Sequence, residues 1–265
     1  MTAPLLALRG AAFSFGSRRV FEAVDFELEP AQVVTVLGTN GSGKSTLLRC
    51  LGGALRLSQG SARLDGQDLS SLDNATRARS IGILFQDHSP SLPFTVREIV
   101  QLGRTPHLSW LGTSRHDDER VVTAAMEEAG VSHLADRAYT ALSGGERHLV
   151  LLARTLAQQP RVILMDEPTA HLDLRNQVRC LRTIRSLASR GVAVVVTTHD
   201  PNHAFVLGDR AVLMKAGAPV VAGRVTEIVN AASLKAAYGI DIGIHQVPRR
   251  PDGDGAASIT ICSPW

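Results

Sequence analysis

The segment VVTVLGTNGSGKST, Val33 to Thr46, decides the fold of this chain. It joins a run of β-branched and apolar residues, Val33 to Leu37, to the helix-like stretch TLLRCLGGAL through a loop rich in glycine. A strand, a glycine loop and a helix in this order are the setting of a phosphate-binding loop, because backbone N–H groups can surround an anion that also meets the positive N-terminus of the helix. For the loop alone, a flexible glycine turn is the alternative. The segment predicts an α/β fold with phosphate contacts from Gly38, Thr39, Asn40, Gly41, Ser42, Gly43, Lys44, Ser45 and Thr46.

Lysine is rare in the chain, since only Lys44, Lys215 and Lys235 stand among its 28 basic residues. The lysine in the glycine loop is therefore a specific feature. We expect Lys44 to reach the β- and γ-phosphates of a nucleotide and the Ser45 hydroxyl to bind Mg²⁺.

A second motif, RVILMDEPTAHLD, covers Arg161 to Asp173. Its apolar run, Val162 to Met165, predicts a buried strand that delivers two carboxylates to the carboxyl edge of a parallel sheet. Asp166 suits an outer-sphere role toward Mg²⁺, and Glu167 suits a general base that activates the attacking water. A polar exit from the strand before a turn is the alternative for these two residues alone.

The third motif is LSGGE, Leu142 to Glu146, followed by a helical pattern over Arg147 to Gln159. With this motif the chain resembles the ATP-binding cassette (ABC) ATPases over nearly its whole length. The resemblance implies that Ser143, Gly144, Gly145 and Glu146 contact the ATP held by a second subunit.

The same resemblance implies roles for four further residues. Gln86 matches the Q-loop glutamine, with a catalytic and a metal-binding role, and Asp173 in Leu172-Asp173 matches the D-loop. His199, after the run Val194 to Thr198, matches the catalytic switch histidine. Phe15 matches the aromatic residue that stacks on adenine. Phe13 remains the alternative, because it lies two residues away and so on the same face of an extended strand.

Three positions depart from the usual family pattern: Thr39 in the phosphate loop, His148 after the signature, and Ala170-His171 before the D-loop. None of these departures removes a predicted catalytic group. We therefore expect them to affect kinetics rather than mechanism.

Alternating apolar and polar residues from 5 to about 30, with a strand and turn at Ala62 to Gly66, predict an antiparallel β part. Helical spacing at Val121, Ala125 and Ala129 marks a different segment. We expect one ABC-type P-loop ATPase domain over 1–265. In it, 1–86 and 151–265 form the RecA-like core, a mainly parallel sheet with helices and the antiparallel β part, and 87–150 form an inserted α-helical signature subdomain.

The end of the chain predicts two short β features. Val212 to Met214 and Val220-Val221 form a predicted hairpin, and Ile259 to Ile261 a short last strand.

The composition excludes several classes of protein. Apolar runs stop at about five residues, whereas a membrane span needs ~20. The N-terminal residues do not match the pattern of a secretory signal, so none is expected. The net charge of +3 is spread along the chain and does not favour nucleic acid as a partner.

The phosphate loop and the LSGGE motif are both anion sites, and one γ-phosphate cannot use both within one chain. The family's solution is a head-to-tail homodimer with two composite ATP sites. Transport is favoured over a soluble, non-transport ABC ATPase, because the chain has neither a sustained heptad pattern nor a second phosphate loop.

The absence of fused membrane helices favours import through separate permease subunits, with a periplasmic or extracellular solute-binding protein as an indirect partner. The expected location is the cytoplasmic face of the inner or plasma membrane. The resemblance indicates a metal-chelate cargo of the iron–siderophore, haem or cobalamin type, with molybdate or another substrate as the alternative. For the permease groove beside Gln86, the candidate contacts are Leu92, Phe94, Arg104 and Leu108. The alternative is that these residues only close the core of the helical subdomain.

Overall fold

The computed structural model describes residues 4–85, 94–107, 115–170, 172–248 and 258–264. The strands are β1 Leu6–Phe15, β2 Arg18–Leu28, β3 Val33–Leu37, β4 Gln59–Leu64, β5 Gln67–Asp68, β6 Ile81–Leu84, β7 Val162–Asp166, β8 Ala193–Thr198, β9 Arg210–Leu213, β10 Val221–Arg224, β11 Gly243–Pro248 and β12 Ser258–Ser263. The helices are α1 Lys44–Leu51, α2 Asn74–Ser80, α3 Val96–Gln101, α4 Arg115–Ala129, α5 Gly144–Ala157, α6 Leu174–Ser189, α7 Pro201–Leu207, α8 Val225–Ile228 and α9 Ala231–Tyr238, with 3-10 helices at Leu69–Ser71, Leu102–His107, Ser132–Leu134 and Tyr139–Ala141.

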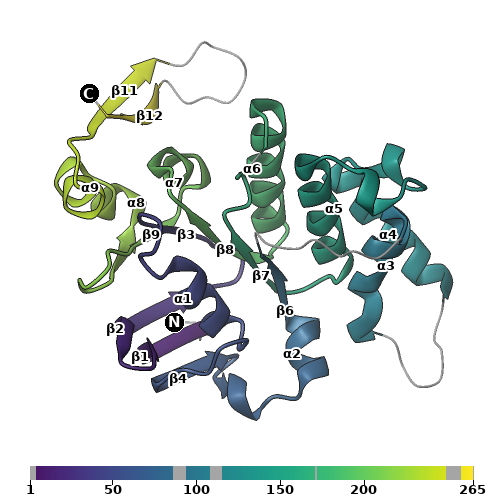
Figure 1. The fold of residues 1–265 in the computed structure, drawn as a ribbon, viewed down its shortest axis with the longest axis horizontal. Helices are drawn as coiled ribbons and strands as arrows, with labels where there is room; N and C mark the ends of the chain where they lie inside the picture. The colour runs from purple at the N-terminus through teal and green to yellow at the C-terminus, as the bar shows by residue number, and fades with distance from the viewer. Residues whose placement is uncertain (1–3, 86–93, 108–114, 171, 249–257, 265) are drawn as a thin grey trace.

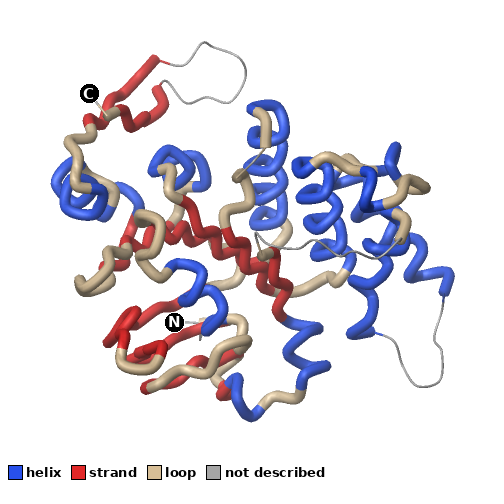
Figure 2. The backbone as a smooth tube through the Cα atoms, in the orientation of Figure 1, coloured by secondary structure: helices blue, strands red, loops and turns tan. Residues whose placement is uncertain are grey.

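The main sheet has the strand order β10-β9-β3-β8-β7-β6. The strands from β9 to β6 run parallel, and β10 pairs antiparallel with β9. Figure 2 shows this sheet as a twisted band through the middle of the molecule. The strands β2-β1-β4-β5 form a separate antiparallel sheet, so the predicted mixed architecture is confirmed.

Both faces of the main sheet are covered. Along β8, Val194 and Val196 belong to a core shared with helices α3 to α6, whereas Ala193 and Val195 belong to a core shared with α1 and the antiparallel sheet. This alternation follows from the two-residue period of a strand. It explains why the central strands read as continuous apolar runs, as expected for a buried parallel sheet.

Helices α3, α4 and α5 lie together beyond the edge strand β6 (Figure 1). Helix α5 continues past residue 150 to Ala157, and the division of the chain at 87–150 stays a prediction. The helix was expected to start at Arg147, but it begins three residues earlier. Gly144 and Gly145 are weak helix formers, yet the capping box between Ser143 and Glu146 stabilises the first turn.

Helices α8 and α9 share a core with strands β3 and β9 of the main sheet, and strand β12 packs against α7. The predicted hairpin at residues 212–221 is confirmed by β9 and β10, and the last strand by β12. The sequence did not predict that β12 pairs with β11 or that α8 and α9 lie between these two hairpins. Asn202 on α7 anchors β12, because its side chain exchanges hydrogen bonds with the backbone N–H and C=O of Cys262 at 2.7 and 3.3 Å.

Candidate active site

The phosphate loop connects the end of β3 to the start of α1, as predicted. Lys44 is 5% exposed and turns back into the loop, where its Nζ donates to the carbonyl oxygens of Gly38 at 2.8 Å and Thr39 at 3.2 Å. The same ammonium lies 3.3 Å from Oε1 of Glu167. The buried positive charge is therefore held by two backbone dipoles and one carboxylate.

Two glycines of this loop are required by geometry. A Cβ on Gly38 would lie 2.3 Å from the backbone oxygen of Met214, and Gly38 has φ 153°. Gly43 has φ 101°, and a Cβ there would lie 2.7 Å from a methyl carbon of Val20. Gly43 is also the N-cap of α1, where no side chain caps the helix. The first N–H groups of α1 are thus available to an anion.

Two carboxylates meet this loop at the end of β7. Asp166 is 4% exposed, and its Oδ1 accepts a hydrogen bond from the Ser45 hydroxyl at 3.0 Å. The Glu167 side chain is 12% exposed, with Oε1 toward Lys44 and Oε2 2.8 Å from Nδ1 of His199. The structure thereby brings together five of the predicted residues.

Thr197 belongs to the same cluster although it was not among the predicted site residues. It is the register partner of Asp166 on β8 and is completely buried. Its hydroxyl contacts Asp166 Oδ1 at 2.6 Å and the backbone N of Glu167 at 2.9 Å. One signal was available in the sequence. Two threonines follow the apolar run Val194 to Val196, just as two carboxylates follow the apolar run Val162 to Met165.

The His199 side chain is 60% exposed and stands between this cluster and α7. Asp200 caps α7 by accepting from the backbone N of Asn202 at 2.9 Å, and the Thr198 hydroxyl lies 3.0 Å from Nδ1 of His203. Burial lowers the pKa of His203, against the opposing effect of Asp200. The turn that carries His199 is therefore fixed at both ends while the imidazole stays accessible.

The two phenylalanines of β1 differ sharply in exposure. Phe15 is 53% exposed, whereas Phe13 is 5% exposed and packs against Phe21 with ring centroids 6.2 Å apart. The rings of Phe13 and Phe15 meet edge to face at 4.8 Å. An exposed ring supported by a buried one is suited to receive a flat ligand, and this favours Phe15 over Phe13 for that contact.

The signature and D-loop residues form helix N-caps. Ser143 caps α5 and Glu146 accepts from the backbone N of Ser143 at 2.8 Å, which lowers the pKa of Glu146. Asp173 caps α6 by accepting from the backbone N of Asn176 at 2.8 Å. Helix α5 lies beyond the edge strand β6, whereas α1 packs on the other face of the sheet (Figure 1). The signature and the phosphate loop of one chain are therefore apart in space.

The residues present fit Mg²⁺ bound together with a nucleotide. Among the residues that the structure describes, no three His, Cys, Asp or Glu side chains gather into a metal site of their own. Mg²⁺ is commonly held by one or two protein oxygens and by substrate phosphates. The Ser45 and Asp166 oxygens, 3.0 Å apart beside the uncapped start of α1, provide this donor set. Gln86 and His171 lie outside the described residues.

Two candidate permease contacts have other roles in the structure, and the other two, Leu92 and Leu108, lie outside the described residues. Arg104 was expected to be available at the surface, and this is wrong. It is 8% exposed, its Nε pairs with Asp118 at 2.7 Å, and its guanidinium donates to Ala157 O at 2.8 Å. Phe94 is half-buried and packs against the core formed with α3 to α5.

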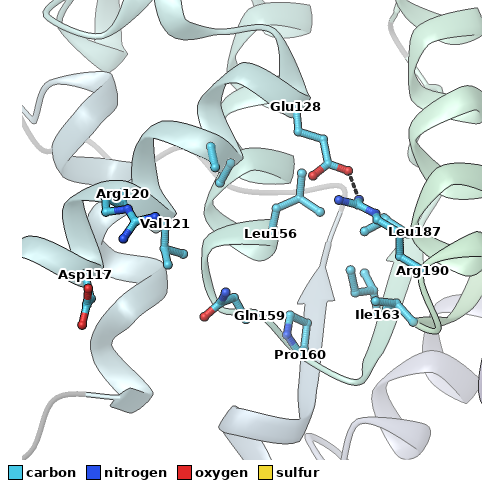
Figure 3. Close-up of a pocket in the computed structure, with 13 residues that line it drawn as sticks. Asp117, Arg120, Val121, Glu128, Leu156, Gln159, Pro160, Ile163, Leu187 and Arg190 are labelled. Carbon is cyan, nitrogen blue, oxygen red and sulfur yellow. Dashed lines mark hydrogen bonds and ion pairs between the residues drawn. The ribbon is translucent and has the colours of Figure 1, made fainter.

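A separate cavity lies between α4, the end of α5 and α6, with the Glu128–Arg190 ion pair at its edge (Figure 3). Ile163 and Val192, which line it, stand at the amino ends of β7 and β8. The cavity therefore lies at the amino ends of these strands, whereas Asp166 and His199 lie at their carboxyl ends. Ligands of open α/β sheets bind outside the carboxyl ends of the strands, so this cavity is not part of the phosphate site.

Residues 21–170 match the family model described as ABC transporter. The hemin import ATP-binding protein HmuV of Pseudomonas fluorescens is 43% identical over 240 residues, which cover 89% of this chain and 92% of that protein. A transporter described as of the metal-chelate ABC type, solved in an inward-facing conformation, is similar with a TM-score of 0.85 and 30% identity over 99% of this chain and 98% of that chain.

A dimeric ATP-binding cassette in a post-hydrolysis state, bound to ADP and Pi, matches with a TM-score of 0.73 and 26% identity over 83% of this chain and 98% of that chain. No helix within the described ranges is both long and apolar enough to cross a membrane. The family match covers more than half of this chain and the HmuV relative nearly all of it. The chain therefore belongs to the ABC transporter family and is an ATPase of that family.

Proposed function

We propose that this chain is the ATP-hydrolysing subunit of an ABC importer and energises uptake of a metal chelate, with haem as the first candidate cargo. The observation that carries the proposal is the cluster of Lys44, Ser45, Asp166, Glu167 and His199 at the carboxyl edge of the main sheet. The cargo is proposed from the relatives, because one of them is named for hemin import and another for a metal-chelate transporter.

Each side chain of the cluster has a distinct proposed task. Lys44 and the uncapped start of α1 bind the phosphates, and Ser45 with Asp166 would hold Mg²⁺, which supplies charge neutralisation on the phosphoryl oxygens. Glu167 takes a proton from the attacking water, and His199 orients Glu167 through its 2.8 Å contact. Gln86 is proposed to join the metal site from its loop.

The complete site is proposed to need a second copy of the chain. The N-terminus of α5, with its Ser143–Glu146 capping box, is an anion site that the same chain's phosphate loop does not share. A head-to-tail homodimer would place this end of α5 against the nucleotide of the other subunit. The dimeric cassette among the solved relatives supports this arrangement.

The proposed location is the cytoplasmic face of the membrane, where the chain binds separate permease subunits and serves a solute-binding protein indirectly. This proposal is supported by the import function in the name of the relative and by the whole-chain similarity to a transporter. Phe94, Leu92 and Leu108 remain proposed contacts of the permease, whereas Arg104 does not.

The test compares uptake of radioiron-labelled haem and of a labelled ferric siderophore in host cells that lack this chain. Restoring the wild-type chain should restore haem uptake. Lys44→Ala should fail to do so, while the matched Lys215→Ala, at an exposed lysine, should restore it. Siderophore uptake without haem uptake would refute the proposed cargo. Uptake of both compounds with Lys44→Ala would refute the proposed ATP dependence.

A further inference from the structure

One buried hydroxyl joins the two carboxylate residues of the site. Thr197 and Asp166 are partners in the parallel pair of β7 and β8, and Thr197 is 0% exposed. The Thr197 Oγ1 lies 2.6 Å from Asp166 Oδ1 and 2.9 Å from the backbone N of Glu167. No other part of the described site contacts both residues through one side-chain atom.

The direction of both hydrogen bonds is fixed. The Glu167 N–H can only donate, so the Thr197 oxygen accepts from it and sends its single proton to Asp166. Asp166 Oδ1 also accepts from Ser45 at 3.0 Å. Two hydroxyls therefore hold the same carboxylate oxygen, and hydrogen bonds to an ionised acceptor are stronger than neutral ones.

The second contact of Thr197 acts on an unusual backbone. Glu167 has φ 48°, in the left-handed region that residues other than glycine seldom adopt. Its N–H donates both to the Thr197 hydroxyl and to the Thr197 carbonyl oxygen, at 2.9 and 3.2 Å. From this backbone the Glu167 carboxylate reaches Lys44 and His199.

We propose that Thr197 is a positioning residue that orients Asp166 toward the metal and Glu167 toward the attacking water. The inference rests on the proposed nucleotide site. A hydroxyl shared between the metal-side carboxylate and the base holds the two at a fixed relative position. When Ser45 binds the metal, its hydroxyl no longer serves Asp166, and Thr197 is the remaining side-chain donor to that carboxylate among the described residues. Loss of the Thr197 hydroxyl should therefore lower the affinity for the metal more than the affinity for the nucleotide.

Three variants separate the hydroxyl from the volume of the side chain. Thr197→Val keeps the branched shape and removes the hydroxyl, Thr197→Cys replaces it with a weak donor, and Thr197→Ser restores it. Thr35→Val is the matched control. Thr35 is also a completely buried threonine, on the neighbouring strand β3, and its hydroxyl has no hydrogen-bond partner among the described residues.

The first readout is binding of Mn²⁺ as a spectroscopic substitute for Mg²⁺, measured by electron paramagnetic resonance with a non-hydrolysable ATP analogue. The second is binding of the analogue without metal, and the third is the Mg²⁺ dependence of ATP hydrolysis. We expect Thr197→Val and Thr197→Cys to lower metal affinity by about 10- to 100-fold, as other changes around metal ligands do. Binding of the analogue without metal should not change, and Thr197→Ser and Thr35→Val should match the wild type.

Wild-type metal affinity in Thr197→Val would overturn the proposal, and so would an equal defect in Thr197→Ser, which would assign the effect to packing. If both variants without a hydroxyl failed to fold while Thr197→Ser folded, the hydroxyl would have a purely structural role and the proposal would also fail. Absence of Mg²⁺-dependent hydrolysis in the wild type would refute the proposed function instead.

Discussion

Replacing Phe15 by alanine should weaken ATP binding and leave the fold intact, whereas replacing Phe13 should do the reverse. The two residues stand two positions apart on β1, and their rings touch at 4.8 Å. They differ in exposure, 53% against 5%. The pair therefore separates a ligand contact from a core contact within one short segment.

The structure sets the size of each effect. Stacking of a base on an aromatic ring contributes ~1–3 kcal/mol, equivalent to a dissociation constant about 5- to 150-fold higher without Phe15. The edge-to-face contact with Phe13 gives Phe15→Ala a loss of stability of at most about 1.5 kcal/mol. Phe13 is buried against Phe21, so Phe13→Ala should lower the free energy of unfolding by about 3–5 kcal/mol.

Calorimetric titration with a non-hydrolysable ATP analogue measures the first effect and urea unfolding the second. Phe15→Trp is the control, because a larger ring should retain binding. If Phe15→Ala bound the analogue as tightly as the wild type, the stacking role would be wrong. If folded Phe13→Ala bound it more weakly than Phe15→Ala, the buried ring would be the important one.

Three further predictions concern other groups. Glu167→Gln should lower turnover by ~10²–10⁴-fold while ATP binding persists, so that an ATP-dependent dimer accumulates in size-exclusion chromatography; a monomer in saturating ATP would contradict the composite site. Burial lowers the pKa of His203, so at about pH 6 the unfolded chain binds a proton at this imidazole more readily than the native chain does. The contribution of neutral His203 to the free energy of unfolding is therefore complete above about pH 6.5 and is lost as the pH falls below it. Urea unfolding between about pH 7.5 and about pH 5.5 should therefore show a smaller loss for His203→Gln than for the wild type, and an equal loss would contradict this. Burial raises the pKa of Cys50 and Cys180 to about 12, whereas Cys262 is partly exposed, so a thiol reagent should label Cys262 first and Cys262→Ser should abolish fast labelling; fast labelling that persisted would place a reactive thiol elsewhere.

The parallel core was predictable because its signals are local. The run Val33 to Leu37 and the run Val162 to Met165 are apolar on both faces, which indicates strands covered on both sides, and both are confirmed. The C-terminal elements were less predictable. Helix α9 and strand β11 have weak periodicity of their own and are placed by contacts with β9, α7 and β12.

The site was predictable in its residue types but not in its internal contacts. Motif spacing indicated Lys44, Asp166 and Glu167. Lys44 comes after the loop that follows β3, and Asp166 and Glu167 stand at the end of β7, so all three lie near the carboxyl ends of parallel strands. The contribution of Thr197 depends on the register between β7 and β8, which is a long-range property. The burial of Arg104 likewise depends on Asp118 and on Ala157 at the end of α5, which lie 14 and 53 residues away in the sequence.

The contacts of Lys44 connect nucleotide binding to activation of the proposed base. Lys44 and Glu167 are nearly buried, at 5% and 12% exposure, and a buried charge without a partner is strongly destabilising. Each therefore neutralises the other at 3.3 Å. In the proposed site, a bound phosphate would compete for Lys44, weaken this ion pair and leave Glu167 with the 2.8 Å contact to His199. The Thr197 hydroxyl accepts from the backbone N of Glu167 at 2.9 Å, so the backbone that carries this carboxylate is anchored to β8. Under the proposed function, the base is released by the same event that delivers its substrate.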